Sequence, residues 1–160
     1  MKRTITLKII TMSPFIRAED IGRKKFQSWL EAIKATDIHF TEEEYCAVDC
    51  SFTYKGVRYA TEIKVRAEKY MDYPTHMLEQ GKLDGMKAYR EANDLDVMLY
   101  CCFFGDYLYI YRLDNNYETE SCRLARTTAE DNGYRNKDII WLVADTALKY
   151  YKNEVKWEQL

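Results

Sequence analysis

Residues 47–64 read AVDCSFTYKGVRYATEIK, and this stretch indicates the fold class of the chain. Apolar and polar residues alternate on each side of Lys55-Gly56. This alternation predicts two strands, over 45–53 and 57–66, and a glycine in the second position of a two-residue loop favours a tight hairpin between them. We therefore expect an antiparallel pair of strands here.

The two-residue loop also fixes the register of this hairpin. If Tyr54 faces Val57, the residue numbers of opposing pairs share one sum, and Asp49 lies directly opposite Glu62. Opposed side chains in an antiparallel pair are about 4.5–5.5 Å apart at Cβ. Because strand residues alternate between faces, Lys64 is expected on the same face as the two acids.

The other face of the hairpin is apolar and is expected to pack into the core. Its residues are Val48, Cys50, Phe52, Tyr59, Ile63 and Val65. The hairpin should therefore have one core face and one face that carries the acids and the lysine.

Segments on both sides of the hairpin extend it into an α+β fold. Apolar residues at helical spacing predict a helix over 18–35 and a second helix over 76–92. Short β-prone runs predict strands over 37–41 and 95–104. The order helix, three strands, helix, strand is that of an α+β core with a mixed sheet. Further expected elements are strands over 3–11, 107–112, 119–125 and 138–143, and a short helix over 144–152.

The length and the N-terminal segment favour one domain outside the membrane. The 160 residues fit a single domain over 1–160, with its core at about 18–104 and an extension over about 105–160. The basic N-terminus resembles the start of a signal peptide, but Lys8 and Pro14 interrupt its apolar run. No segment approaches the roughly 20 apolar residues that span a bilayer. We expect a cytoplasmic protein.

Composition limits the kind of site. The five cysteines show no metal-finger spacing and are expected to be reduced thiols. The formal net charge of −2 argues against binding of nucleic acid through bulk electrostatics alone. It leaves room for an enzyme that neutralises phosphate locally with a metal ion and a few lysines.

The opposed acids of the hairpin suggest a divalent metal site. Like charges held side by side destabilise a strand pair unless a cation compensates them. Magnesium suits this task, since it takes carboxylate oxygens at about 2.0–2.1 Å and keeps several waters. Such an ion polarises a phosphoryl oxygen and activates a bound water, which Lys64 could orient. Two other interpretations stay open: a solvated hairpin face, or neutralisation of Asp49 and Glu62 by Lys64 without metal.

On these residues the chain resembles the PD-(D/E)XK nuclease superfamily. Val48-Asp49 and Glu62-Ile63-Lys64 match its motif on the second and third strands, with Val48 in the place of the usual proline. The resemblance covers about 18–104 and is nearest to small Holliday-junction resolvases and phage-type nucleases. It implies a restriction-endonuclease-like αβββαβ core and a Mg²⁺- or Mn²⁺-dependent DNA endonuclease. Asp49 and Glu62 would bind the metal, and both would act in catalysis with Lys64.

The resemblance also implies a further acid at the start of the first helix, directed towards the metal. Glu19 holds the matching place and is assigned as the fourth catalytic residue. Asp20 beside it and Glu31 near the far end of the helix stay open as alternatives. A favourable charge in the first helical turn explains Glu19 equally well. The run Arg23-Lys24-Lys25 on this helix is interpreted as its solvated side.

Substrate contacts are expected on the second helix and close to the motif. The family commonly places lysine or glutamine on this helix near the scissile phosphate, which indicates Lys82 and Gln80. A solvated lysine explains Lys82 as well. Gly81 costs about 1 kcal/mol in a helix interior and suggests a close approach to the backbone there. Arg66 is assigned as a further substrate contact.

The expected partner is nucleic acid, with DNA favoured over RNA, and no membrane. Duplex, branched and single-stranded substrates all stay open, and so does a homodimer. The alternative function is a catalytically inactive module of the same fold that binds nucleic acid or a protein partner. A third interpretation, an unrelated interaction protein, requires the hairpin register to be accidental.

Overall fold

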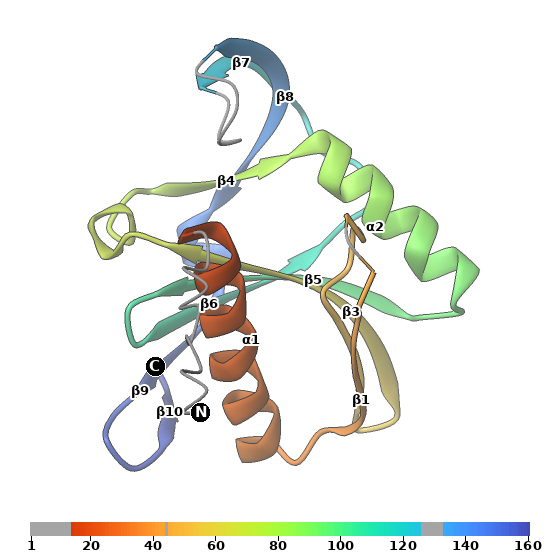
Figure 1. Cartoon of the computed structure of the whole chain (residues 1–160), viewed down its shortest axis with the longest axis vertical. Helices are drawn as coiled ribbons and strands as arrows, with labels where there is room; N and C mark the ends of the chain where they lie inside the picture. Colours follow the sequence, from red (N-terminus) through yellow and green to blue (C-terminus); the bar gives the residue numbers. More distant parts are fainter. Residues whose placement is uncertain (1–13, 44, 126–132) are drawn as a thin grey trace, which may run out of the picture.

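The computed structural model describes residues 14–43, 45–125 and 133–160 (Figure 1). The strand expected over 3–11 lies outside these residues. The helices and strands are α1 (Pro14–Ala32), β1 (Thr36–Phe40), β2 (Cys50–Tyr54), β3 (Val57–Arg66), β4 (Thr75–Glu79), α2 (Gln80–Ala92), β5 (Val97–Phe104), β6 (Tyr107–Leu113), β7 (Glu120–Ala125), β8 (Tyr134–Val143), β9 (Leu148–Lys152) and β10 (Trp157–Gln159). Short 3₁₀ turns lie at Glu68–Tyr70 and Ala144–Thr146.

These elements form a mixed α+β fold, as the sequence predicted. A seven-stranded sheet has the order β1-β2-β3-β5-β6-β9-β10, and a three-stranded sheet has the order β4-β8-β7. β3 and β5 run parallel and every other strand pair is antiparallel. The parallel pair needs a crossover connection, which α2 supplies. All eight residues of β5 are buried, which fits a strand covered on both faces.

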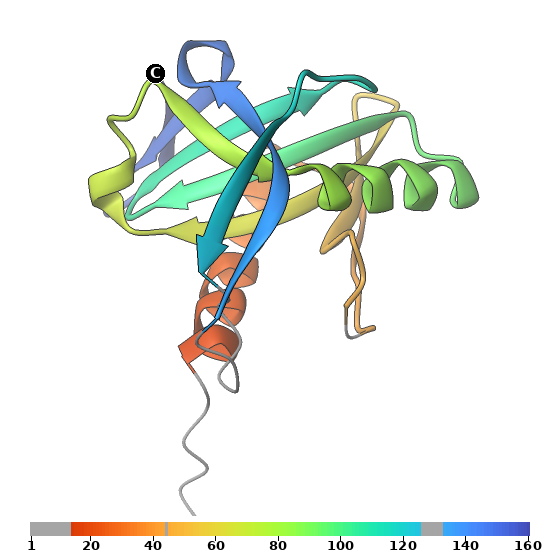
Figure 2. The same ribbon diagram turned by 90° about the horizontal axis from the view of Figure 1, so that it is seen from above.

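The two helices lie on opposite faces of the large sheet (Figures 1 and 2). An apolar cluster covers each of these faces. On one face, α1 packs Phe26, Trp29 and Leu30 against alternate residues of β2 and β5. On the other face, α2 and the smaller sheet pack against the intervening residues of β5. α1 and α2 therefore lie on opposite sides of β3. Within the described residues, no helix is long and apolar enough to cross a membrane.

Two glycines let the helices approach the centre of the sheet closely. A Cβ at Gly22 of α1 would lie 2.9 Å from Cγ2 of Val65 on β3. A Cβ at Gly85 of α2 would lie 2.7 Å from Cβ of Ala47, just before β2. Real Cβ atoms do not approach other atoms so closely, so a larger residue at either position would push a helix away from the hairpin.

The predicted hairpin is confirmed, and its register is confirmed as far as Cys50 and Thr61, but the ladder ends there and Asp49 is not paired opposite Glu62 as expected. Tyr54 pairs with Val57, and the pairing continues in register to Cys50 and Thr61. The two loop residues have φ angles of 48° and 77°, as expected for a type I′ turn that ends in glycine. The strand expected over 45–53 is shorter, because the ladder of β2 begins only at Cys50.

One face assignment on the hairpin was wrong. Val48 was expected to point to the same side as Cys50, but it packs in the cluster of α2 while Cys50 packs in the cluster of α1. The alternation breaks at Asp49, whose N–H donates to the carbonyl of Thr61 at 2.8 Å although Thr61 already pairs with Cys50. This irregularity turns the preceding residue to the other face.

Two of the expected helices differ in the structure. The second helix was expected over 76–92, but its first residues form β4, which pairs with β8, and α2 begins at Gln80. The helix expected over 144–152 is wrong beyond a 3₁₀ turn, since 148–152 form β9. β9 pairs with β6, and the rings of Tyr107 and Tyr151 lie 4.9 Å apart. Long-range pairing has overridden local helical periodicity in both places.

Candidate functional site

Asp49 lies at the point where the hairpin ladder ends. Its carboxylate Oδ2 accepts a hydrogen bond of 2.8 Å from the N–H of Ile63 on β3. The side chain thus replaces a backbone acceptor that the interrupted ladder no longer supplies. Its carbonyl oxygen accepts the N–H of Thr41 at 2.9 Å, which ties it to the end of β1. Asp49 is therefore held in one orientation by backbone groups on two sides.

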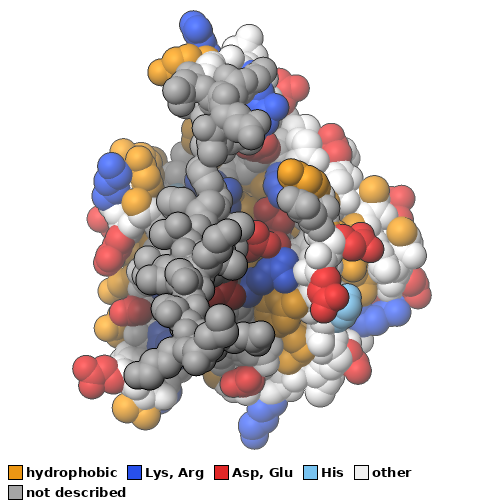
Figure 3. Space-filling model, in the orientation of Figure 1, with side chains coloured by type: hydrophobic (Ala, Val, Ile, Leu, Met, Phe, Trp, Pro, Cys, Tyr) orange, Lys and Arg blue, Asp and Glu red, His pale blue; other side chains and the backbone are white. Residues whose placement is uncertain are grey.

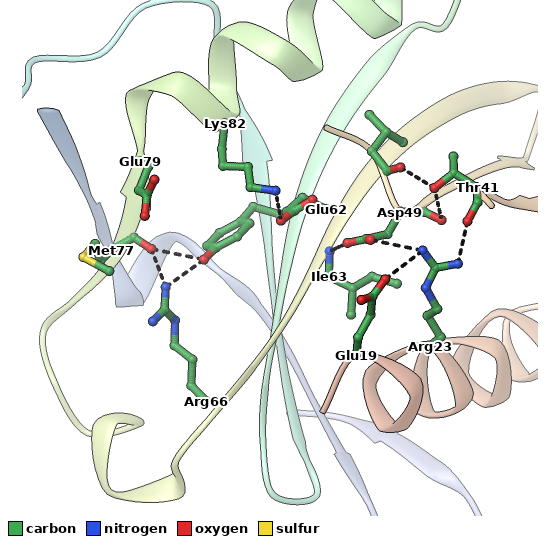
Figure 4. Close-up of polar contacts among 12 residues, drawn as sticks. Glu19, Arg23, Thr41, Asp49, Glu62, Ile63, Arg66, Met77, Glu79 and Lys82 are labelled. Carbon is green, nitrogen blue, oxygen red and sulfur yellow. Dashed lines mark hydrogen bonds and ion pairs between the residues drawn. The ribbon is translucent and has the colours of Figure 1, made fainter. Parts of the chain in front are cut away.

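Glu62 belongs to β3 and lies next to Asp49, on the side of the sheet that faces α2 (Figure 4). The residue is only 5% exposed, and its Oε1 lies 3.1 Å from Nζ of Lys82 on α2. Its Oε2 is buried without a hydrogen-bond partner. Burial, and then the neighbouring Asp49 carboxylate, raise the pKa of Glu62 to about 8, although Lys82 acts in the opposite direction. A buried carboxyl with one unsatisfied oxygen is costly unless a further cation or proton compensates it.

Arg23 of α1 reaches Asp49 from the opposite side (Figure 4). Its Nη2 lies 3.4 Å from Oδ1 of Asp49 and 3.2 Å from Oε1 of Glu19. Its Nη1 donates to the carbonyl of Thr41 at 2.8 Å, and its guanidinium carbon lies 5.9 Å from the ring centre of Phe40. The two acids are therefore flanked by one cation from each helix.

The structure distinguishes the three acids considered on α1. Glu19 is joined to Asp49 through the same nitrogen of Arg23, so these two carboxylates are neighbours. Asp20 instead pairs with Lys24 at the surface, and Glu31 accepts from Gln27. Glu19 is thus the helix acid that the structure brings to the site.

Lys64 lies two residues beyond Glu62 on the same face of β3 and is exposed. Within the part of the chain that the structure describes, its ammonium makes no hydrogen bond or ion pair. In the structure, the cations next to the acid pair are Arg23 and Lys82 rather than Lys64. Lys64 is left available to a ligand.

The start of α2 forms a second part of the site. Lys82 contacts Glu62, while Gln80 donates to Asp84 on its own helix at 2.8 Å. Glu79, just before the helix, pairs with Lys137 of β8 at 2.7 Å. The space next to Gly81 is open, with no atom within 4 Å of a Cβ built there. No protein group approaches Gly81 among the described residues, and a ligand would have room to do so.

Arg66 lies two residues beyond Lys64, where the structure gives it partners inside the protein. Its Nη2 donates to the carbonyl of Met77 and to the hydroxyl of Tyr100, both at 2.9 Å. Its Nε is buried without a partner. These bonds join β3 to β4 and β5, so Arg66 has an evident structural task beside any contact with substrate.

Arg23 is the site residue that the sequence interpretation missed. Its basic run was assigned to the solvated side of α1, which is correct for Lys24 but not for Arg23. It is also wrong for Lys25, which donates to the carbonyl of Gly105 at 2.6 Å. The spacing held a usable signal, because Arg23 lies four residues after Glu19 and therefore on the same face of the helix. The space-filling view shows basic and acidic side chains together in a hollow near the middle of the molecule (Figure 3).

The donor set fits magnesium in one of its usual protein sites. Asp49 and Glu62 supply two carboxylates, and Oε2 of Glu62 has no other partner. Among the described residues, no three acidic, histidine or cysteine side chains are grouped so that they could hold a metal. Magnesium is commonly bound through one or two carboxylates, with waters and substrate phosphate oxygens as its other ligands. The fit is therefore to an open site, in which most ligands of the ion would come from outside the protein, rather than to a closed protein cage.

Comparisons with protein-family models and with curated proteins found no match to this chain.

Proposed function

We propose that this protein is a metal-dependent nuclease of the PD-(D/E)XK type that hydrolyses phosphodiester bonds, with DNA as the favoured substrate. The observation that carries the proposal is the pair of neighbouring acids Asp49 and Glu62, of which Glu62 is buried and has one carboxylate oxygen without a partner. The charged form of Glu62 is costly beside Asp49 unless a proton or a further cation compensates it, and a divalent cation would compensate both acids at once.

The element order supports the same proposal. α1, β1, β2, β3, α2 and β5 follow the αβββαβ order that the sequence resemblance implies, with β4 inserted before α2. Asp49 precedes β2, and Glu62 and Lys64 lie on β3, next to the parallel strand β5. The restriction-endonuclease-like core is thus part of the proposal.

Each residue has a distinct task in the proposed reaction. Asp49 and Glu62 would bind Mg²⁺ or Mn²⁺, which polarises the phosphoryl oxygen and supplies an activated water. Lys64 would orient the attacking water or offset charge that develops in the transition state. Lys82 would contact the phosphate once the ion has taken over the charge of Glu62.

A second candidate function has one observation in its favour. Each acid already has a cation next to it, Arg23 for Asp49 and Lys82 for Glu62. An inactive module that binds nucleic acid or a protein partner could keep its acids neutralised in this way, without any metal.

Cleavage of nucleic acid separates the two candidates. Supercoiled plasmid and a labelled four-way junction would be incubated with the wild type and Asp49→Asn, each with Mg²⁺, Mn²⁺ or EDTA. We expect metal-dependent cleavage by the wild type and a loss of about a thousandfold or more in the variant, since ligand loss removes several kcal/mol of transition-state stabilisation.

Asp37→Asn is the matched control, because Asp37 is exposed on β1 and its positive φ of 50° is tolerated by asparagine. This control should cleave like the wild type. A folded wild type that cleaves neither substrate with either metal would support the inactive module instead.

A further inference from the structure

The guanidinium of Arg23 lies beside Oδ1 of Asp49, the carboxylate oxygen that makes no hydrogen bond to the backbone. Oδ2 of Asp49 is engaged by the N–H of Ile63, a backbone group that cannot leave without opening β3. Oδ1 has Arg23 as its neighbour, at 3.4 Å. A magnesium ion would need a carboxylate oxygen at about 2.0–2.1 Å, and a guanidinium beside the same oxygen would repel it.

The same nitrogen of Arg23 also contacts Glu19, so the guanidinium lies between two carboxylates. Its other contact, with the carbonyl of Thr41 at 2.8 Å, is on Nη1 and does not depend on either acid. The bond to Thr41 is the shortest of the three, and the contact with Asp49 is the longest. Arg23 could therefore release Asp49 and keep its anchor on the end of β1.

We propose that Arg23 is an exchangeable counter-ion, which neutralises Asp49 and Glu19 in the metal-free protein and gives up Asp49 when a divalent cation binds. This inference rests on the proposed function, since it concerns the same metal. It makes Arg23 a positioning residue that sets the metal affinity of the site.

A fixed role for Arg23 predicts the opposite result. If Arg23 only held Asp49 in the orientation that binds metal, loss of the guanidinium would weaken metal binding. If Arg23 competes with the metal, its loss would strengthen binding, because one positive charge is removed from the oxygen that the ion uses. The sign of the change therefore decides between the two roles.

Titration calorimetry with Mn²⁺ alone, at low ionic strength and without substrate, measures this sign. We expect Arg23→Gln to bind Mn²⁺ on the order of tenfold more tightly than the wild type. Lys24→Gln is the matched control, because it removes the same charge from the next residue of α1 and breaks a similar i, i+4 pair, with Asp20. Since Lys24 is 77% exposed, its effect should stay within about twofold.

A double-mutant cycle tests the part played by Glu19. Glu19→Gln should change Mn²⁺ affinity little in the wild type, where Arg23 holds Glu19, but should remove most of the gain in Arg23→Gln. Circular dichroism of each variant checks that the fold is kept. Mn²⁺ should also raise the Tm of Arg23→Gln more than that of the wild type, because tighter binding stabilises the folded state more.

The outcomes separate this inference from the proposed function. Unchanged or weaker Mn²⁺ binding by folded Arg23→Gln, with a wild type that binds Mn²⁺ and cleaves DNA, would overturn the exchange of Arg23 and leave the nuclease intact. Absence of Mn²⁺ binding in the wild type, Arg23→Gln and Asp49→Asn alike would overturn both.

Discussion

The two acids of the site lie side by side, but one is held by the α1 side of the sheet and the other by the α2 side. Asp49 has both carboxylate oxygens engaged, one by the N–H of Ile63 and one by Arg23. Glu62 has one oxygen next to Lys82 and one that is buried without a partner. The two carboxylates are chemically similar, but their hydrogen-bond and ion-pair partners differ.

This difference assigns the two acids different tasks. Asp49 is ordered in advance by the backbone of two strands, so it can present a ligand in a fixed place. Burial and the neighbouring Asp49 carboxylate destabilise the charged form of Glu62, which raises its pKa to about 8. The pair would thus offer a cation one rigid ligand, and one carboxylate whose charge the ion could compensate in place of a proton.

Beyond the loss of Asp49, the largest effect is expected at Lys64, which lies on the same face of β3 as Glu62 but is exposed. Lys64→Ala should lower the rate of metal-dependent cleavage by about a hundredfold, because a charge near the transferring phosphoryl group contributes roughly 3 kcal/mol. Its Tm should stay within about 1 °C, since the side chain is exposed and has no partner among the described residues. Single-turnover cleavage and a thermal melt measure the two effects, and Lys87→Ala on α2 is the charge control. A large fall in Tm without loss of cleavage would remove Lys64 from the site.

A smaller effect is expected on the pH dependence of stability. Glu62 has a pKa of about 8 in the folded protein against an ordinary value of 4.5, so between these values the folded state keeps a proton that the unfolded chain has lost. Stability should therefore fall as pH rises through this window, by at most about 1.4 kcal/mol per pH unit, and stop falling above it.

Glu62→Gln removes this titration. Urea unfolding of metal-free protein should find the variant more stable than the wild type at pH 9, by a few kcal/mol, with the difference shrinking towards pH 5. Glu91→Gln on the exposed side of α2 should follow the wild type. If the free energy of unfolding depends on pH in the same way in the wild type and in Glu62→Gln, the pKa of Glu62 is not raised in the folded protein.

The smallest effect is expected at Lys82. Lys82→Met removes the charge that lowers the pKa of Glu62, so this pKa should rise further above its present value. Because Lys82 is 45% exposed, solvent screens the pair and the loss of stability at pH 9 should be only about 1 kcal/mol. Carboxyl-detected NMR of Glu62 measures the pKa change, with Lys87→Met as the control. A lower pKa in Lys82→Met would contradict the pairing.

Local sequence signals predicted the centre of the fold well. The two-residue loop ending in Gly56 determined the hairpin register as far as Cys50 and Thr61, and Asp49 lies close to Glu62 just beyond that point. The interruption of the ladder at Asp49 was not predictable. It arises because the N–H of Asp49 donates to the carbonyl of Thr61, a residue that already pairs with Cys50. Both β4 and β9 were expected as helix, because their strand character comes from partners far away in the sequence.

The cations of the site were the part that sequence predicted least. Lys82 was named on α2, but its contact with Glu62 arises from the close approach of that helix, which Gly85 allows. Arg23 was set aside because a basic run on a helix is usually solvated. Which member of such a run turns inward depends on how α1 lies on β3, and Gly22 permits that approach.

The central claim is that Asp49 and Glu62 together bind one divalent cation. Electron paramagnetic resonance of free Mn²⁺, titrated into metal-free wild type and into Asp49→Asn/Glu62→Gln at pH 8.5, tests it most directly. We predict that the wild type removes about one equivalent of Mn²⁺ from solution and that the double variant, folded by circular dichroism, removes none. Equal Mn²⁺ binding by both proteins, or none by the wild type, would contradict the claim.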